Sequence, residues 1–589
     1  MCTIGIQVND AGFWKTEARS VLIAFLIHEL IMFTGVLISV YLDSPKPPKM
    51  NVVHYKSSFG KLYTTIAFIL YSLISVLYRP DEKFEPDLIS NQLINLAYDY
   101  KNFLTYRCKT IQYEIVADKN HLEWYKYCNN IDQLLRQHRS TEQICFPNEE
   151  FVTDFTFLKR TERSPIKNVV IVFLESTRYD MMPFNASSIP INKTLREEAL
   201  KEDITPFMRE LVNKSRYTNK GKSVSSFTAK AIIGGVCSVY PYPENYDSES
   251  RYEFYKMCLP KLLEKYANMS SAFINPLIVN FYKLEDIMAK AGFQEIIGAE
   301  RIAAGEFGIP PNKFLIPLGY DDGFYLKVIH DWVQKQIKNN KNFLLTYATS
   351  ATHEPFVTPT DWQGKKLSNN YAHNKYLNAI AYSDWFLNKL IDDFKEQGLL
   401  NNTLFVILGD HGISLGEHDS WITTDIPYET SFSISMLLYT ENKEWNTIFP
   451  PGKFNEQWTT IDILPTIIDA LQFDGTNKQF KDKYDYEGQS ILRAKYERRV
   501  QLSFTNPGIS SIIAREGNWK IILPGTNWVR ERVYNLEKDE YELEALDFES
   551  LEPEVMNWVK DMRFVREIYT VKVKEWYENA TPRNSPLLP

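Results

Sequence analysis

The sequence lacks any excess of basic residues. Its 589 residues include 66 lysines and arginines against 74 aspartates and glutamates, which gives a formal net charge of −8 at pH 7. This balance argues against a nucleic-acid-binding protein, because binding to phosphate backbones depends on clustered positive charge. The chain also has no repeat of fixed period and no low-complexity tract, which argues against a repeat protein. An aromatic content of 14% fits a folded protein and gives no support for wholesale disorder.

Long apolar runs are confined to the N-terminal part of the chain. Residues 20–42 form an apolar run of 23 residues, which is long enough to span a bilayer, although His28 and Glu29 are costly in its middle. Residues 62–78 form a second run of 17 residues without a charge, at the short edge of the spanning range. We expect two transmembrane helices, and the alternative is a pair of buried or interfacial helices.

The charges around these runs predict the topology of the chain. The loop at residues 43–61 holds four lysines, whereas the tail at residues 1–19 has one lysine and one arginine. The positive-inside rule therefore places the loop in the cytoplasm and everything after residue 78 on the far side. The first run lacks a basic start and a clear cleavage site, so we interpret it as an anchor. The predicted location is the membrane, with a lumenal or extracellular catalytic domain.

Two further features agree with an extracytoplasmic body. Acceptor sequons for N-glycosylation occur at Asn185, Asn192, Asn213, Asn268, Asn401 and Asn579. Five of the six cysteines follow the second apolar run, and connectivity cannot be read from sequence. We expect Cys237 to pair with Cys258, and two of Cys108, Cys128 and Cys145 to pair with each other.

From residue 168 onward, buried strand patterns alternate with helical patterns. The strand runs are residues 168–174, 343–347, 404–408 and 433–439, and the helical patterns are residues 205–213, 374–397 and 460–471. This alternation predicts an α/β fold with a mostly parallel sheet covered on both faces. Short antiparallel strands at residues 499–504, 511–516 and 519–524 predict a small C-terminal α+β subdomain. The predicted domains after the second apolar run are a stem at 79–165, a catalytic domain at 166–475, and the C-terminal subdomain and tail at 476–589.

Two acids and a histidine follow predicted buried strands. Glu175 comes directly after the strand at 168–174, and Asp410 and His411 follow the strand at 404–408 after one glycine. Open α/β sheets place their sites at the carboxyl ends of parallel strands. Carboxylate oxygens and an imidazole suit one divalent cation such as Mn, Zn or Mg, with Ca a poorer fit, and a second metal stays open.

A hydroxyl-rich segment supplies candidate nucleophiles. Residues 221–228 read GKSVSSFT and lead into an apolar helical run at residues 229–236. The start of a helix attracts phosphate or sulfate through its free N–H groups and its dipole, although such a hydroxyl also serves as an ordinary helix cap. The residues themselves leave four candidates open, namely Ser223, Ser225, Ser226 and Thr228.

Several motifs occur together between residues 168 and 543. They are NVVIVFLES with Glu175, Tyr240-Pro241, His353-x-Pro355-Phe356, Asp410-His411-Gly412, and the closing segments GNWKIILP and RVYNLEKDEYE. In the identity and order of these motifs the chain resembles the alkaline phosphatase superfamily. The resemblance is to its sulfatase-like branch in particular, which includes lipoteichoic acid synthase and the phosphoethanolamine transferases. The resemblance implies an alkaline-phosphatase-like, sulfatase-like α/β sandwich.

The resemblance also implies roles for individual residues. Counting back from the Tyr-Pro pair makes Thr228 the nucleophile, and the family's metal ligands fall on Glu175, Thr228, Asp410 and His411. His353 and His418 would hold phosphate oxygens or protonate the leaving group.

The chain also departs from true sulfatases. Those enzymes carry Cys-x-Pro-Ser-Arg, whereas residues 228–232 here read Thr-Ala-Lys-Ala-Ile. Their first strand ends in two adjacent acids, whereas Glu175 is followed by Ser176. Both departures favour the members that transfer phosphoryl groups through a threonine. We interpret Asp384, in the helix before the Asp-His-Gly strand, as structural.

Taken with the resemblance, these features predict a membrane-tethered, metal-dependent hydrolase that acts on phosphate esters through a covalent phospho-threonine. Its expected partners are the membrane and a phosphate-ester substrate, which membrane tethering favours as lipid-linked or glycan-linked. One alternative is a transferase that moves a phosphoethanolamine or phosphoglycerol type of group to a lipid or glycan. Two others are a sulfuric ester hydrolase and a catalytically inactive binding scaffold.

Overall fold

The structure, a computed structural model, describes the chain from residue 164 to residue 579 with several gaps. The described residues are 164–185, 202–241, 246–251, 258–310, 314–316, 319–455, 457–471, 487–492, 500–505, 511–524 and 530–579. They all belong to one compact unit, residues 106–589. Within these ranges no helix has the length and apolar character needed to cross a membrane. The predicted transmembrane helices at residues 20–42 and 62–78, the stem up to residue 163, and Cys108, Cys128 and Cys145 lie outside the described residues.

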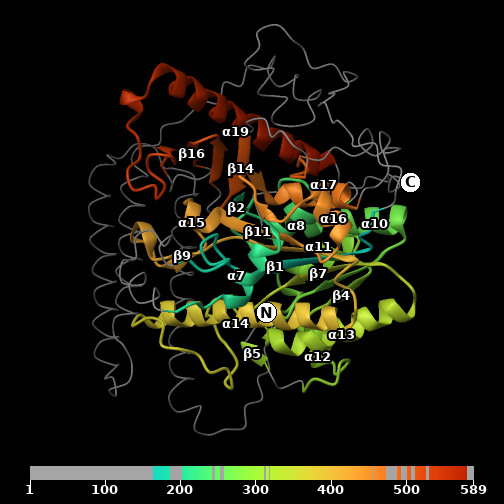
Figure 1. Ribbon diagram of the computed structural model, residues 1–589. Helices are drawn as coiled ribbons and strands as arrows, with labels where there is room; N and C mark the ends of the chain where they lie inside the picture. The colour runs from blue at the N-terminus through green and yellow to red at the C-terminus, as the bar shows by residue number, and fades with distance from the viewer. Residues whose placement is uncertain are drawn as a thin grey trace, which may run out of the picture. The chain divides into compact units, whose positions relative to one another are not determined.

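The described part of the chain is built on a nine-stranded sheet (Figure 1). Its strands in chain order are β1 (Asn168–Leu174), β2 (Arg216–Lys222), β3 (Ser270–Ile274), β4 (Glu295–Ile297), β7 (Phe343–Ala348), β8 (Thr403–Gly409), β11 (Ser433–Tyr439), β12 (Gly452–Lys453) and β13 (Trp458–Thr459). Their spatial order is β12-β2-β11-β8-β1-β7-β3-β4, and β13 also pairs with β2. The strands β8, β1, β7, β3 and β4 are parallel neighbours, whereas β11 is antiparallel to both β8 and β2. The predicted mostly parallel sheet is confirmed.

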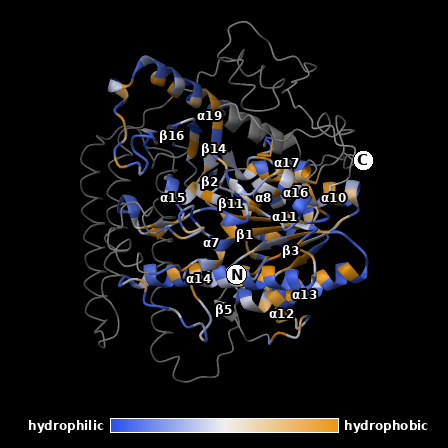
Figure 2. Ribbon diagram, in the orientation of Figure 1, coloured by the Kyte–Doolittle hydropathy of each residue, from blue (hydrophilic) through white to orange (hydrophobic). Residues whose placement is uncertain are grey.

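Two helical layers cover this sheet because successive side chains of a strand point to opposite faces. In β1, Val169, Ile171 and Phe173 pack into one apolar core, and the intervening side chains pack into another. The first core is closed by α8 (Thr228–Cys237), α10 (Leu259–Ala267), α11 (Leu284–Ala291), α16 (Lys443–Ile448) and α17 (Ile463–Ala470). The second is closed by α7 (Pro206–Asn213), α12 (Ala299–Ala303), α13 (Asp322–Lys338) and α14 (Tyr371–Glu396). Figure 2 shows hydrophobic strands between helices of mixed character.

Shorter elements connect these layers. They are α9 (Ser248–Arg251), the 3₁₀ helices η2 (Phe281–Lys283), η3 (Glu417–Asp419) and η4 (Thr460–Asp462), β5 (Phe314–Ile316), β6 (Gly319–Tyr320), β9 (Ser414–Leu415), β10 (Ile422–Thr423) and α15 (Glu429–Phe432). The strand β9 pairs with β10, and β5 pairs with β6. The pair β9–β10 lies in the segment that follows the Asp-His-Gly motif.

A second, antiparallel sheet forms the C-terminal part. It contains β14 (Val500–Phe504), β15 (Ile512–Glu516), β16 (Trp519–Leu523) and β17 (Arg532–Asn535) in that spatial order. The helix α19 (Pro553–Asn579) packs Val559 and Met562 into the core of this sheet, and the 3₁₀ helix η6 (Phe548–Ser550) precedes it. The predicted short antiparallel strands are therefore confirmed, and the predicted boundary of a C-terminal subdomain at residue 476 stays a prediction. The sheet reaches the hydroxyl-rich segment through a bridge between Ser225 and Phe504.

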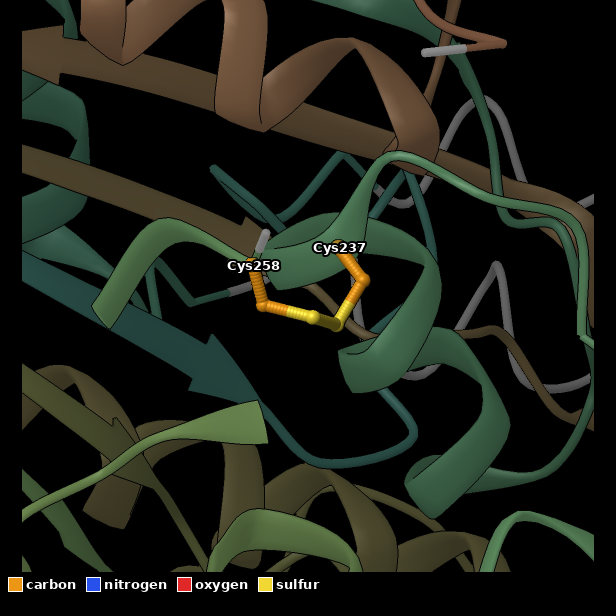
Figure 3. The surroundings of a disulfide bond; sticks show 2 residues. All are labelled: Cys237 and Cys258. Carbon is orange, nitrogen blue, oxygen red and sulfur yellow. A yellow bond between two sulfur atoms is a disulfide. The ribbon is translucent and has the colours of Figure 1, made fainter. Parts of the chain in front are cut away.

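A disulfide fixes the end of the helix that follows the hydroxyl-rich segment. Cys237, the last residue of α8, is bonded to Cys258, the residue before α10 (Figure 3). Both cysteines are buried. The predicted pairing of these two residues is confirmed.

Candidate metal centre and nucleophile

The register of the central strands brings the predicted acids together. Leu174 of β1 lies beside Gly409 of β8, so the next residues, Glu175 and Asp410, leave the same edge of the sheet side by side. His411 follows directly. One ligand atom from each of these three side chains lies within 4.8 Å of the others, and all three residues are buried. The three residues therefore lie at the carboxyl ends of parallel strands, which is where open α/β sheets place their sites.

Asp410 keeps one oxygen available in this cluster. Its Oδ1 accepts hydrogen bonds from the backbone N–H of Ser176 at 2.9 Å and of His411 at 2.7 Å. Its Oδ2 is buried and has no hydrogen-bond partner among the described residues. An unpartnered carboxylate oxygen is costly in a buried site. A divalent cation would satisfy it, so the donor set fits a metal ion.

The orientation of His411 fits the same role. Its Nδ1 lies 2.9 Å from the carbonyl oxygen of Gly412, to which it donates. This hydrogen bond leaves the lone pair of Nε2 for the cluster, where Nε2 lies 3.4 Å from Oδ2 of Asp410 and 3.7 Å from Oε1 of Glu175. Metal-binding histidines are commonly oriented in this way through the other ring nitrogen.

Two glycines allow the Asp-His turn to lie against neighbouring backbone. A Cβ atom on Gly409 would come within 2.2 Å of the carbonyl oxygen of Thr177, and one on Gly412 within 2.1 Å of that of Thr430. Any side chain at either position would push the turn away from these segments. The two glycines therefore fix the place of Asp410 and His411.

The electrostatics of the cluster favour the binding of a cation. Burial and the nearby carboxylate of Glu175 raise the pKa of Asp410 to about 7. Burial alone would lower the pKa of His411, but the carboxylates of Asp410 and Glu175 outweigh it and the pKa is raised. Two carboxylates in a low-dielectric site are favourable only with a cation beside them.

Among the four candidate nucleophiles, Thr228 is the one whose hydroxyl contacts this cluster, and the hydroxyl of Ser176 also donates to Oε1 of Glu175, at 2.7 Å. Thr228 is the first residue of α8, and its Oγ1 donates to Oε2 of Glu175 at 3.0 Å and lies 3.2 Å from Nε2 of His411. Of the other candidate hydroxyls, those of Ser223 and Ser225 make local contacts, and that of Ser226 is buried without a hydrogen-bond partner among the described residues. Ser223 Oγ donates to the carbonyl oxygen of Ser225 at 2.7 Å, and Ser225 Oγ accepts from the backbone N–H of Phe227 at 3.2 Å.

The model of the family described as Sulfatase matches residues 167–473, which is more than half of the chain. The chain belongs to the Sulfatase family. This membership places it in the alkaline phosphatase superfamily, as its motifs indicate.

Curated relatives within this family include two kinds of enzyme. An arylsulfatase from Clostridium perfringens is 25% identical over 162 residues, which cover 27% of this chain and 31% of that protein. The chain thus spans about a third of the arylsulfatase's length. A lipoteichoic acid synthase from Staphylococcus aureus is 23% identical over 499 residues, which cover 80% of this chain and 68% of the synthase.

Solved structures support the same fold. The lipoteichoic acid synthase LtaP from Listeria monocytogenes superposes with a TM-score of 0.54 at 19% identity, covering 71% of this chain and 94% of that one. A protein of the alkaline phosphatase superfamily from Vibrio parahaemolyticus gives a TM-score of 0.52 at 16% identity, with 70% and 90% covered. At these identities the likeness concerns the fold alone.

His353 and His418 are placed differently from the cluster residues. His353 follows β7, the neighbour of β1, and its Nδ1 lies 2.7 Å from the carbonyl oxygen of Glu354. His418 stacks on the ring of Tyr428, with the ring centroids 3.6 Å apart. Among the contacts of the described residues, none joins either imidazole to Thr228 or to the candidate metal ligands Glu175, Asp410 and His411. Burial and nearby Lys520 lower the pKa of His418 to about 4, so this imidazole is neutral at pH 7.

Asp384 has the structural role expected of it. Its carboxylate accepts hydrogen bonds from the backbone N–H of Phe207 at 3.0 Å and of Met208 at 2.7 Å, both in the first turn of α7. Free N–H groups at the start of a helix need such acceptors. Asp384 therefore attaches α7 to α14.

Sequence reasoning missed a buried ion-pair cluster that joins the loops after β1 and β8, which carry Glu175, Asp410 and His411. Arg178 donates to both carboxylate oxygens of Asp180, from Nε at 2.9 Å and from Nη2 at 2.7 Å. Its Nη1 donates to Oε1 of Glu417 at 2.7 Å. All three side chains are fully buried. Arg178 follows Glu175 by three positions and Glu417 follows His411 by six, so the ion pairs connect the two loops that carry the candidate metal ligands.

Proposed function

We propose that the protein is a metal-dependent hydrolase of phosphate esters that works through a covalent phospho-threonine at Thr228. The observation that carries this proposal is the contact of the Thr228 hydroxyl with both Glu175 and His411 at the buried cluster. A hydroxyl at that place can act as a nucleophile, because it lies beside candidate metal ligands and at the start of a helix.

Glu175, Thr228, Asp410 and His411 would hold one divalent cation, of which Mn, Zn and Mg fit the mixed oxygen and nitrogen donors. The metal, when bound, lowers the pKa of the coordinated hydroxyl and neutralises charge on the phosphoryl group. Two observations support this ligand set. Oδ2 of Asp410 has no hydrogen-bond partner among the described residues, and Nε2 of His411 faces the carboxylates of the cluster.

Thr228 attacks phosphorus in line with the departing alcohol oxygen. A bond forms between Oγ1 and phosphorus as the bond from phosphorus to the alcohol oxygen breaks. Because Thr228 begins α8, the free N–H groups of the first helical turn and the helix dipole stabilise charge on the phosphoryl oxygens. Water then breaks the bond between phosphorus and Thr228 and regenerates the hydroxyl.

We assign His353 and His418 to contacts with the phosphoryl oxygens or the leaving group. His353 emerges from β7 on the same sheet edge as Glu175, and the hydroxyl of Thr352 donates to the carbonyl oxygen of Glu175. His418 has a lowered pKa, so it fits a neutral hydrogen-bonding group better than an acid. His353 is therefore the candidate for protonating the departing alcohol.

The proposed location is the membrane, with the catalytic domain in the lumen or outside the cell. The disulfide between Cys237 and Cys258 fits an oxidising compartment. The sequon asparagines Asn185, Asn213, Asn268 and Asn401 are exposed in the structure, as glycosylation requires. A membrane-tethered enzyme would meet lipid-linked or glycan-linked phosphate esters.

A transferase is the second candidate function. The similarity to a lipoteichoic acid synthase extends over 80% of this chain, and the same phospho-threonine would serve if an alcohol replaced water as the acceptor. A sulfuric ester hydrolase is disfavoured because a threonine stands where true sulfatases carry their modified cysteine. The assembled cluster argues against an inactive scaffold.

The proposal is tested by replacing Thr228 and a neighbouring hydroxyl. Thr228→Ala should fold and bind metal but lose phosphate-ester turnover by several orders of magnitude, because covalent catalysis is removed. Thr228→Ser should keep partial activity, since the hydroxyl survives. The matched control is Ser226→Ala, which removes a buried hydroxyl two residues away that has no hydrogen-bond partner among the described residues. Equal turnover in Thr228→Ala and Ser226→Ala would overturn the assignment.

A further inference from the structure

Four aromatic side chains gather beside the proposed nucleophile. They are Phe227, Tyr246, Phe281 and Tyr282, and we call them the aromatic platform. The rings of Tyr246 and Tyr282 stack with centroids 4.7 Å apart. The ring of Phe227 packs edge-on against both, with centroid distances of 4.8 Å to Tyr246 and 5.4 Å to Tyr282. The ring centroids of Phe281 and Tyr282 are 4.2 Å apart. These rings come from three segments that are distant in the sequence, so the platform is a product of the fold.

Part of this platform is exposed to solvent. The exposed fraction is 50% for Phe281 and 39% for Tyr282, whereas large aromatic side chains are mostly buried in folded proteins. The backbone beneath them is also unusual, because Tyr282 and Lys283 both have positive φ, at 49° and 55°. Two consecutive non-glycine residues in this region cost free energy. Strain that presents aromatic rings to solvent suggests a binding role.

The platform adjoins the proposed reaction centre. Phe227 directly precedes Thr228 in the chain and is the N-cap residue of α8. A group esterified to a phosphate at Thr228 would therefore lie within reach of the platform.

The arrangement of the rings limits what the platform can bind. The rings contact each other, so they do not form the open box that surrounds a quaternary ammonium group. The exposed part of the platform consists of the side chains of Phe281 and Tyr282, and a salt bridge of 3.7 Å between Lys283 and Asp247 borders it. This surface is too small and too polar to hold a lipid chain. A sugar ring fits better, because its C–H face can lie on the negative face of an aromatic ring while its hydroxyls reach charged groups at the edge.

We propose that the aromatic platform binds a sugar ring of the substrate and so makes the enzyme selective for phosphate esters of carbohydrates. This inference rests on the proposed function at Thr228, and it assigns Tyr282 and Phe281 as specificity-determining residues.

The test compares two esters that have the same kind of leaving group. Glucose 6-phosphate and glycerol 3-phosphate are both esters of primary alcohols, and only the first carries a ring. The platform variant Tyr282→Ala should lower the ratio of kcat/KM for glucose 6-phosphate to that for glycerol 3-phosphate by about 3–10-fold, the scale of one aromatic contact. Tyr282→Phe should retain the ratio because it retains the ring. The control Tyr266→Ala removes a tyrosine that is 44% exposed on α10 and should not change the ratio.

A binding measurement separates this inference from the proposed function. Methyl glucoside has no phosphate, and its NMR signals should broaden in the presence of the Thr228→Ala protein. The signals should stay sharp in the presence of the double variant Thr228→Ala/Tyr282→Ala. If neither ester is hydrolysed but this difference occurs, the platform stands and the proposed function fails. If esters are hydrolysed with the same ratio in the wild type and Tyr282→Ala, or if methyl glucoside binds both proteins equally, the platform is refuted.

Discussion

Replacement of Arg178 by methionine tests whether buried ion pairs hold the two metal-binding loops together. The guanidinium is fully buried and binds Asp180 through two nitrogens and Glu417 through one. Burial alone would raise the pKa of Glu417, and Arg178 outweighs it and keeps that pKa below its usual value. Without Arg178, two buried carboxylates lose their only arginine partner among the described residues and must be protonated or hydrated.

The expected cost follows from this burial. Removing one partner of a buried ion pair typically costs about 3–5 kcal/mol, because an uncompensated charge remains. At about 2.1 cal/mol/K of unfolding entropy per residue, a body of about 400 residues would lose roughly 4–6 °C in Tm. Since the cluster fixes the loops of both Glu175 and Asp410, metal affinity should also fall, by about 10-fold or more.

A matched control is provided by Arg209. It also binds one aspartate, Asp203, through two nitrogens, at 2.8 Å and 3.0 Å, but its side chain is 50% exposed. Arg209→Met should therefore cost only about 0.2–1 kcal/mol. The assay is chemical unfolding of each variant together with titration of Mn²⁺. If Arg178→Met is no more destabilising than Arg209→Met and binds Mn²⁺ as the wild type does, the reasoning about the loops is wrong.

Three other predictions concern the metal, the acid response and the location. Asp410→Asn and His411→Ala should each lose bound metal and activity together, and elemental analysis showing normal metal in the double variant would contradict the ligand set. The pKa of His418 is lowered to about 4 by burial and then by Lys520, with smaller effects of Glu417, Arg532 and Asp539. Because an unfolded histidine titrates near 6.5, the unfolded chain binds the proton first, and stability is lost as the pH falls from about 6.5 to 4. His418→Gln should lose less unfolding free energy over that range than the wild type, and equal losses would refute this. Glycosidase treatment of protein from a secretory eukaryotic host should sharpen and lower its gel band, and an unshifted band would count against the predicted topology.

The sequence predicted those parts of the fold whose signal is local. The runs that became β1, β7, β8 and β11 are buried along their whole length, so they read as continuous apolar segments. In contrast, β2 has the polar sequence RYTNKGK and was not expected as a strand. Its place in the sheet depends on partners far along the chain, such as β11 and β13. The antiparallel direction of β11 could not be read from composition either.

The candidate site shows the same division. Glu175, Asp410 and His411 were predicted to meet because they follow the carboxyl ends of buried strands, and they do, since the two strands are neighbours in the sheet. Arg178 and Glu417 were missed, because their contact joins positions 239 residues apart and neither lies in a recognisable motif. An arginine three residues after a strand-end acid was the one available signal. Among the described residues no contact joins His418 to Thr228 or to the acid–histidine cluster, so its role at the phosphoryl group stays a prediction.

The most direct test of the central claim is mass spectrometry of the protein after rapid acid quench during turnover of a phosphate ester. The account predicts phosphate, or a substrate-derived phospho-alcohol, on the peptide that holds Thr228, with fragmentation placing it on that residue. The adduct should be absent from Thr228→Ala. A label on Ser223, Ser225 or Ser226, or its persistence in Thr228→Ala, would contradict the proposed nucleophile.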